Sequence, residues 1–276
     1  MTDPTRTIEI NNKQQVMSCT LNHQSERISK LLTVVMPVRI DCEERKANLR
    51  AVLSLLCDLN CRTIVLEADS APVLQNEEWA TNVEYLFVND KSPVFHRTHY
   101  INMLLRMADT EIVSIWDTDV LITYEQLFEA ISMIENGCTI AYPYNGEFIM
   151  LSNIESDMIR QRFDVEYLKG RRMQSLFGRK SCGGVFLVDR KKYIACGGEN
   201  ERFTGWGPED AERLRRISIL GHKVCWTSKG QAYHLYHPRG ENSNYYTNDD
   251  AIRLRKEFCR VCTMDKDEMI RYIRTW

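Results

Sequence analysis

Hydrophobic residues in the first 120 positions gather into four short runs that have the composition of buried strands. These runs span residues 31–38, 62–69, 84–90 and 111–120. Strands buried on both faces are typical of a parallel sheet. After the first run, hydrophobic residues recur at the spacing of an amphipathic helix, at Leu49, Val52, Leu53 and Leu56. With a second helix expected at about 99–108, the alternation predicts an α/β fold whose mostly parallel, Rossmann-like central sheet is flanked by helices.

The second half of the chain has a less regular pattern of hydrophobic positions. Three further strands are expected over residues 139–145, 184–193 and 223–228. Helical spacing of hydrophobic residues returns at about 125–135 and 208–220.

No proline- or serine-rich linker divides the chain. We therefore expect one main domain over residues 31–245. Its first part, 31–120, would bind a nucleotide, and its second part, 121–245, would supply acceptor- and metal-binding residues. Residues 1–30 are expected to form an N-terminal extension. Residues 246–276 are expected to form one or two amphipathic helices.

The charge balance limits the kinds of partner that the chain can have. Lys and Arg number 36 and Asp and Glu number 38, which gives a net charge of -2. Without an excess of cations, nucleic acid is not expected as a partner. No hydrophobic run approaches the roughly 18 residues of a membrane span, and the polar N-terminus lacks the pattern of a signal peptide. We therefore expect a cytoplasmic protein.

Ten cysteines are scattered along the sequence. Cys259 and Cys262 form one C-x-x-C pair, but no second pair stands near it to complete a zinc site. The expectation is reduced, mostly buried thiols, as in a reducing compartment.

Charged residues stand at the carboxyl ends of the four predicted strands, at Arg39, Asp69, Asp90 and the pair Asp117 and Asp119. In a Rossmann-like sheet, ligands bind at this edge. Two carboxylates so close together would repel each other without a cation. A hard divalent ion such as Mn²⁺ or Mg²⁺, itself bound to a diphosphate, would remove the repulsion. The alternative is a loop with two solvated aspartates.

Two further polar features could complete such a site. His234 and His237 lie three residues apart, so on a turn or short helix both could face one ion, and imidazole suits Mn²⁺. Their alternative is one structural and one exposed histidine. Arg97 could bind phosphate bidentately, or it could be a solvated residue at a helix start.

The segment Gly205–Asp210 combines an aromatic ring with two acids. Trp206 stands between two glycines, and Glu209 and Asp210 follow a proline that suits the first turn of a helix. An aromatic face beside a carboxylate is a common way to hold a sugar, and one acid could take the proton from an attacking hydroxyl. The helix dipole is expected to lower its pKa and keep it ionised. The alternative is ordinary charge at a helix start.

Together these motifs resemble the β-1,4-galactosyltransferase-like and chondroitin-polymerase-like GT-A glycosyltransferases over most of residues 31–242. The most specific piece is the Gly-Trp-Gly-x-Glu-Asp motif that follows a Gly-Gly strand. The resemblance implies the GT-A fold of nucleotide-diphospho-sugar transferases, a UDP-sugar donor, and Mn²⁺ or Mg²⁺ as the cofactor.

The resemblance also implies roles for single residues. The donor nucleotide would meet Pro37, Val38, Arg39, Arg97, Asp117 and Asp119, and Asp69 is expected beside it from its place at a strand end. The metal ligands would be Asp119 and His237, with His234 and Asp117 as further candidates. The sugars would meet Trp206, Gly184 and Glu209. Asp210 would be the catalytic base, with Glu209 beside it.

Two positions depart from the family pattern. Asp41 stands where the family often has a second arginine, and Ala211 stands where a third acid often follows the Glu-Asp pair. The acceptor-facing part of the site is therefore expected to differ from that of other members.

The function that the resemblance implies is metal-dependent, inverting glycosyl transfer. A hexose or N-acetylhexosamine would move from a UDP-sugar to a glycan or lipid-linked glycan, forming a β-linkage in surface polysaccharide or glycolipid synthesis. The C-terminal helices could touch the inner face of a membrane, or they could simply pack on the domain. One alternative is a non-catalytic relative that binds carbohydrate or nucleotide-sugar. The other is a sugar nucleotidyltransferase, which would normally have a glycine-rich loop where residues 35–48 contain no glycine.

Overall fold

The computed structural model describes residues 26–162, 168 and 180–276. Its main sheet contains β1 (Leu32–Val38), β2 (Arg62–Asp69), β3 (Val83–Asn89), β4 (Ile112–Trp116), β6 (Ile140–Tyr142), β8 (Val185–Asp189) and β9 (Val224–Trp226). In the part of the chain described, these seven strands lie in the order β3-β2-β1-β4-β8-β6-β9. Only β8 runs antiparallel to its neighbours in this sheet. The predicted mostly parallel sheet is therefore confirmed.

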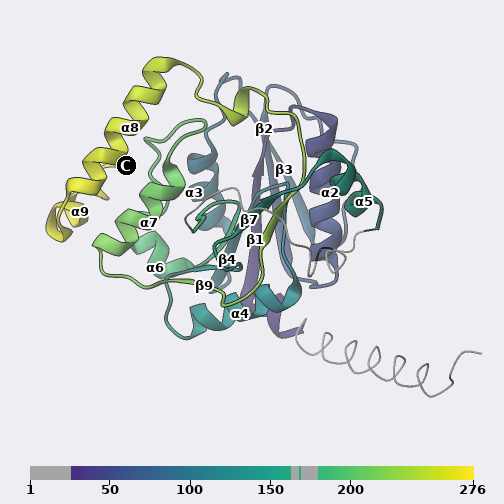
Figure 1. The fold of residues 1–276 in the computed structure, drawn as a ribbon, viewed down its shortest axis with the longest axis horizontal. Coiled ribbons are helices and arrows are strands. Elements are labelled where there is room, and N and C mark those ends of the chain that lie inside the picture. The colour runs from purple at the N-terminus through teal and green to yellow at the C-terminus, as the bar shows by residue number, and fades with distance from the viewer. Residues whose placement is uncertain (1–25, 163–167, 169–179) are drawn as a thin grey trace, which may run out of the picture.

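Helices cover both faces of the sheet. The helices of the described chain include α2 (Glu43–Cys57), α3 (Arg97–Met107), α4 (Tyr124–Glu135), α5 (Asn153–Arg162), α6 (Arg190–Ala195), α7 (Glu209–Ile219), α8 (Asn248–Thr263) and α9 (Lys266–Tyr272), of which α8 and α9 pack on α7. In Figure 1 the sheet is seen along its edge, with α2 and α5 on one side and α3, α6 and α7 on the other. All seven residues of β1 are buried, as expected of a central strand covered on both faces.

A small second sheet lies beside the carboxyl ends of the main strands. It consists of β5 (Val120–Leu121), β10 (Ala232–His234) and β7 (Phe148–Met150), in the order β5-β10-β7. β10 pairs antiparallel with β5, so that His234 lies opposite Val120. This pairing brings a segment from the end of the domain to the residues that follow β4.

Three sequence expectations about secondary structure were wrong. The strand expected over residues 111–120 ends at Trp116, and after a turn Val120 belongs to a separate strand, β5. The region 184–193 is not one strand, because the Asp189 side chain accepts a hydrogen bond from the Lys192 backbone N–H and starts α6 there. His234 lies in a strand, not in a turn or short helix. The elements β7, α5 and β10 were not predicted; β7 and β10 have only three residues each, too few to show a periodic pattern.

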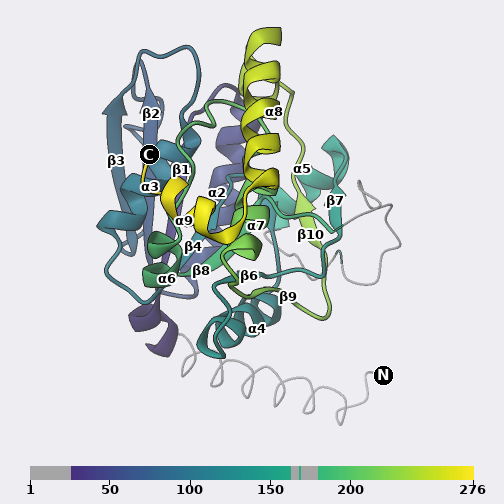
Figure 2. The same ribbon diagram turned by 90° about the vertical axis from the view of Figure 1, so that its left-hand side faces the viewer.

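The C-terminal helices pack on the domain. Leu254 and Val261 of α8 and Met269 of α9 are buried, and the Trp276 indole N–H donates to the Gly197 carbonyl oxygen at 2.9 Å. Figure 2 shows α8 lying in front of α7. Among the described residues, no helix has both the length and the hydrophobicity to cross a bilayer.

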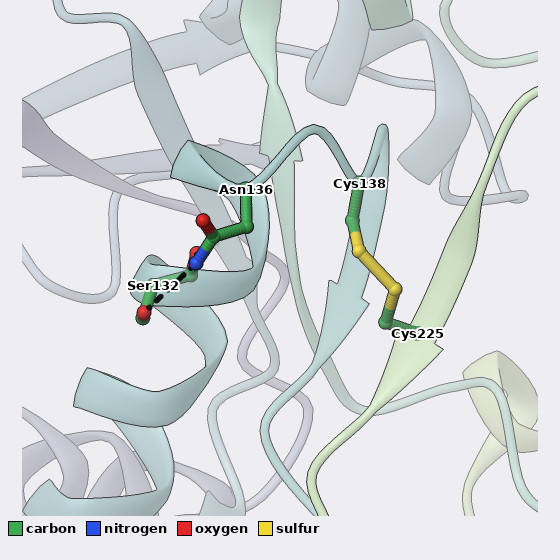
Figure 3. The surroundings of a disulfide bond; sticks show 4 residues. All are labelled: Ser132, Asn136, Cys138 and Cys225. Carbon is green, nitrogen blue, oxygen red and sulfur yellow. Dashed lines mark hydrogen bonds between the residues drawn. A yellow bond between two sulfur atoms is a disulfide. The ribbon is translucent and has the colours of Figure 1, made fainter.

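A disulfide joins Cys138, which follows α4, to Cys225 in β9 (Figure 3). The expectation of reduced thiols is wrong for this pair. The two cysteines are 87 residues apart in sequence, and the pairing of β6 with β9 brings their backbones together. Among the other described cysteines, six are free: Cys42, Cys57, Cys61, Cys196, Cys259 and Cys262.

Candidate active site

The turn after β4 directs its two aspartates toward different partners. The turn is fixed by three hydrogen bonds: from the Trp116 indole to the Val120 carbonyl at 2.7 Å, from the Asp117 N–H to the Gly184 carbonyl at 2.8 Å, and from the Leu235 N–H to the Asp119 carbonyl at 2.7 Å. The Asp119 carboxylate faces β10, whereas the Asp117 carboxylate accepts from Arg97 at 2.5 Å.

Asp119, His234 and His237 form a group that could hold a metal ion. Nε2 of His234 lies 3.4 Å from Oδ1 of Asp119, and Nε2 of His237 lies 3.2 Å from Oδ2. The candidate ligand atoms all lie within 4.8 Å of one another. Nδ1 of His234 is buried and has no hydrogen-bond partner among the residues that the structure describes. One carboxylate and two imidazoles suit Mn²⁺ or Zn²⁺, so these residues fit the divalent ion that the sequence predicted.

The electrostatics of this group favour an ionised carboxylate. Burial by itself raises the pKa of Asp119, but the neighbouring His234, His237 and Arg45 outweigh burial and hold that pKa well below its usual range. Burial lowers the pKa of His237, and the Asp119 carboxylate more than reverses this effect, so that the pKa of His237 is raised.

The structure adds Arg45, which sequence reasoning missed. It lies in α2, and its guanidinium donates to Oδ2 of Asp119 at 3.2 Å and to Oδ1 of Asp41 at 2.9 Å, and lies 3.3 Å from Nδ1 of His237. The signal that could have found it was the i, i+4 spacing of Asp41 and Arg45 at a helix start. The sequence singled out Asp41 only as a departure from the family pattern.

Asp117 is not part of the metal-ligand group found among the described residues. Its carboxylate accepts two hydrogen bonds from Arg97, from Nε at 3.2 Å and from Nη2 at 2.5 Å. The positive charge of Arg97 thus meets the acid after β4, and Asp117 is close enough to both Asp119 and Asp210 for their charges to interact with its own.

Asp210 is held from two sides. Oδ1 accepts from the buried Arg213 at 2.7 Å, and Arg213 also donates to the buried Glu199 at 2.8 and 3.0 Å. On the other side, the carboxylate lies against the backbone of Gly183. The Asp210 side chain is still 34% exposed, so a substrate hydroxyl can reach it.

Glu209 has a different environment from Asp210. Its Oε2 atom is buried and has no hydrogen-bond partner within the described part of the chain. Burial, and then the negative charge of Asp210, raise the pKa of Glu209 to about 8. The expectation that the helix dipole would keep an acid here ionised is therefore wrong for Glu209, because burial costs more than the dipole contributes.

The Trp206 ring lies at the surface, with 45% of its area exposed. It contacts the ring of Tyr245 edge-on, with centroids 4.9 Å apart. Gly205 before it has a φ of +69° and lies against Val94, so a side chain there would clash. The exposed indole face is accessible, and its contact with a sugar stays a prediction.

The residues expected around the nucleotide lie at the carboxyl ends of β1 and β2. Pro37 and Val38 belong to β1. Arg39 donates to the carbonyl oxygens of Ala68 and Ser92 and to the Asp90 carboxylate, at 2.8 to 3.0 Å. Its guanidinium therefore ties the strand ends together and is already engaged by the protein.

Asp69 and Gly184 also have local structural partners. The Asp69 carboxylate accepts from the Ser70 N–H at 2.6 Å. Gly184 has a φ of +82°, and a Cβ there would meet Phe148 and Val120. The carbonyl of Gly184 accepts the hydrogen bond from the Asp117 N–H, so this glycine helps to position the turn that carries Asp117 and Asp119.

The chain is similar to known proteins in both sequence and structure. The family model described as the N-terminal domain of galactosyltransferase matches residues 172–238. Beta-1,4-galactosyltransferase 7 of Mus musculus and that of Homo sapiens are each 35% identical over 79 residues, which is 27% of this chain. The match spans about a fifth (21%) of the length of these relatives.

Solved structures extend the comparison to the whole fold. GalNAc-T7 with UDP, GalNAc and Mn²⁺ superposes with a TM-score of 0.59 at 13% identity, over 88% of this chain and 49% of that chain. A Drosophila β1,4-galactosyltransferase 7 complex with manganese, UDP-Gal and xylobiose has a TM-score of 0.45 at 18% identity, over 75% and 71% of the two chains.

The sequence match contains part of the site, whereas Asp119 lies outside it. Asp210, Trp206, His234 and His237 all fall within residues 172–238. The resemblance to the galactosyltransferases is therefore confirmed over this segment, and the chain has the GT-A fold of the glycosyltransferases.

Proposed function

We propose that this chain is a metal-dependent, inverting glycosyltransferase. It moves a hexose or N-acetylhexosamine from a UDP-sugar to a hydroxyl of a glycan acceptor and forms a β-linkage. The observation that carries the proposal is the pairing of two features at one end of the sheet. A carboxylate–imidazole group suits a divalent ion, and Asp210 is held in place yet open to solvent.

Asp210 acts as the base. Its carboxylate takes the proton from the acceptor hydroxyl as the new bond between that oxygen and the anomeric carbon forms. The bond between the anomeric carbon and the diphosphate oxygen breaks, and UDP leaves. The configuration at the anomeric carbon is inverted because the acceptor oxygen attacks from the opposite face. Arg213 and the Gly183 backbone hold Asp210 for this task.

Residues that follow β4 and residues in or after β10 would stabilise the negative charge of the leaving diphosphate. Asp119, His234 and His237 would hold the divalent ion, which when bound neutralises the negative charge that develops on the diphosphate. Arg97, fixed by Asp117, places a further positive charge close to these residues.

The chemistry of the site and the similarity to galactosyltransferases support the substrate classes that we propose. The donor is UDP-galactose, UDP-N-acetylgalactosamine or UDP-glucose. Trp206 covers the apolar face of a sugar, and the acceptor is a growing glycan or lipid-linked glycan. We extend the proposal to surface polysaccharide or glycolipid synthesis.

The test is release of UDP from a panel of UDP-sugars, with glycan acceptors, in Mn²⁺ or in EDTA. We expect turnover of one donor in Mn²⁺ alone, and a fall of about 10²- to 10⁴-fold in Asp210→Asn. Asp267→Asn is the matched control, because Asp267 is the second residue of α9 as Asp210 is of α7, but it is exposed. Equal turnover in EDTA, or full activity in Asp210→Asn, would overturn the mechanism.

Calorimetric titration with UDP and Mn²⁺ covers the case in which no donor turns over. Binding without turnover would favour the non-catalytic relative. The absence of any binding would remove the proposed function altogether.

A further inference from the structure

Arg45 contacts a carboxylate oxygen that would otherwise be available to a metal ion. Its side chain is only 14% exposed, and its guanidinium reaches Oδ2 of Asp119. This is the same oxygen that His237 approaches at 3.2 Å. The permanent positive charge of Arg45 therefore already contacts the Asp119 carboxylate, which a divalent ion would need as a ligand.

The contact between Arg45 and Asp119 should affect metal binding because the candidate ligand group carries little negative charge. A Mn²⁺ site with neutral histidines has one negative charge, from Asp119, among the described residues grouped there. Arg45, which also pairs with Asp41, offsets part of that charge before the ion arrives. Because like charges a few ångströms apart in a partly buried site repel strongly, the ion alone should bind weakly.

Asp41 keeps Arg45 in this position. Its Oδ1 accepts from Nε of Arg45 at 2.9 Å, and its Oδ2 accepts from Nδ2 of Asn242 at 3.2 Å. Asp41, which departs from the family pattern, thus orients the Arg45 guanidinium toward the candidate metal ligands. The guanidinium is anchored at one nitrogen, while its other two nitrogens face Asp119 and His237.

We propose that Arg45 couples metal binding to the nucleotide diphosphate, so that the ion binds tightly only when the diphosphate is present. This inference rests on the proposed function. The diphosphate supplies the negative charge that allows both cations to remain, and a guanidinium suits phosphate oxygens. Because the linkage is reciprocal, the metal must raise the affinity for the diphosphate by the same factor.

The experiment measures Mn²⁺ binding to the full chain by electron paramagnetic resonance of free Mn²⁺, without and with saturating UDP. In the wild type we expect weak binding of Mn²⁺ alone and binding at least about tenfold tighter with UDP. In Arg45→Gln we expect Mn²⁺ alone to bind about tenfold tighter than in the wild type, and the effect of UDP to shrink correspondingly. Arg45→Lys keeps the charge and should retain most of the coupling.

Arg50→Gln is the matched control, because Arg50 lies on the same helix but pairs with Glu77 at the surface. It should leave both Mn²⁺ affinities unchanged, and melting temperatures of all variants show that they are folded. Equal Mn²⁺ affinities in Arg45→Gln and the wild type would overturn the role of Arg45 while leaving the proposed function standing. A wild type that binds neither UDP nor Mn²⁺ would remove the proposed function, and this inference with it.

Discussion

The carboxylate of Asp210 lies directly against the backbone of Gly183. A Cβ atom built on Gly183 would come closer to Oδ2 of Asp210 than the 3.0 Å below which real Cβ atoms are essentially never found. Arg213 donates to the other carboxylate oxygen at 2.7 Å. The position of the proposed base therefore depends on the Arg213 side chain and on the lack of a side chain at Gly183.

Gly183→Ala should reduce catalysis without abolishing donor binding. The added methyl group displaces the Asp210 carboxylate, and misplacement of a catalytic group by about 1 Å can cost about 10²-fold in rate. We expect kcat to fall about 10- to 100-fold while the affinity for UDP with Mn²⁺ changes less than about threefold. Steady-state kinetics and calorimetry measure these quantities. A folded variant with wild-type kcat would show that Asp210 does not need this position.

The two aspartates after β4 should differ in their effect on metal binding. Asp119 contacts both histidines, whereas Asp117 is bound by Arg97. We expect Asp119→Asn to weaken Mn²⁺ binding in the presence of UDP by more than about tenfold, since a metal ligand is lost. Asp117→Asn should change it less than about threefold. A large loss in Asp117→Asn would restore Asp117 as a direct ligand, as the sequence allowed.

The stability of the free protein should depend on pH through Glu209. Its pKa is raised from 4.5 to about 8, so the folded state keeps a proton that the unfolded state loses. The stabilising effect is complete below about pH 4.5 and is lost as the pH rises toward 8. Above 8 the folded protein carries the full cost of a buried charge.

Glu209→Gln should therefore be more stable than the wild type at pH 8, by at least about 1 kcal/mol, since one pKa unit corresponds to about 1.4 kcal/mol. The gain should vanish near pH 4.5. Urea unfolding across this range measures the difference. Asp267→Asn controls for the loss of an acid from the first turn of a helix. A gain that did not grow with pH would contradict the raised pKa.

Removal of the disulfide should destabilise the domain. The bond closes a segment of 87 residues, and cross-links over such distances typically contribute about 2–4 kcal/mol. We expect the Cys138→Ala, Cys225→Ala double variant to lose about that much in denaturant unfolding, and reduction of the wild type to do the same. Cys57→Ser, at an exposed free cysteine, is the control. Unchanged stability on reduction would mean that the bond does not constrain the chain.

Most of the sheet could be predicted from the sequence because its strands are buried on both faces. Such strands must be hydrophobic along their whole length, and β1, β2 and β4 show this pattern directly. The sites at strand ends followed from the same logic, since ligands bind at the carboxyl edge of a parallel sheet. Asp119 was found in this way. The histidines and the Gly-Trp-Gly-x-Glu-Asp motif came from spacing and from the family resemblance.

The sequence by itself determined the residue types of the site and the layered fold that carries them. Only the tertiary structure decided which of them meet. Asp117 and Asp119 are two residues apart, yet the turn after β4 sends one to Arg97 and the other to His234 and His237. Arg45 reaches Asp119 across 74 residues of sequence, and Cys138 reaches Cys225 across 87. Sequence spacing encodes local geometry, whereas contacts over such distances depend on how strands pair and helices pack, so that local pattern cannot specify them.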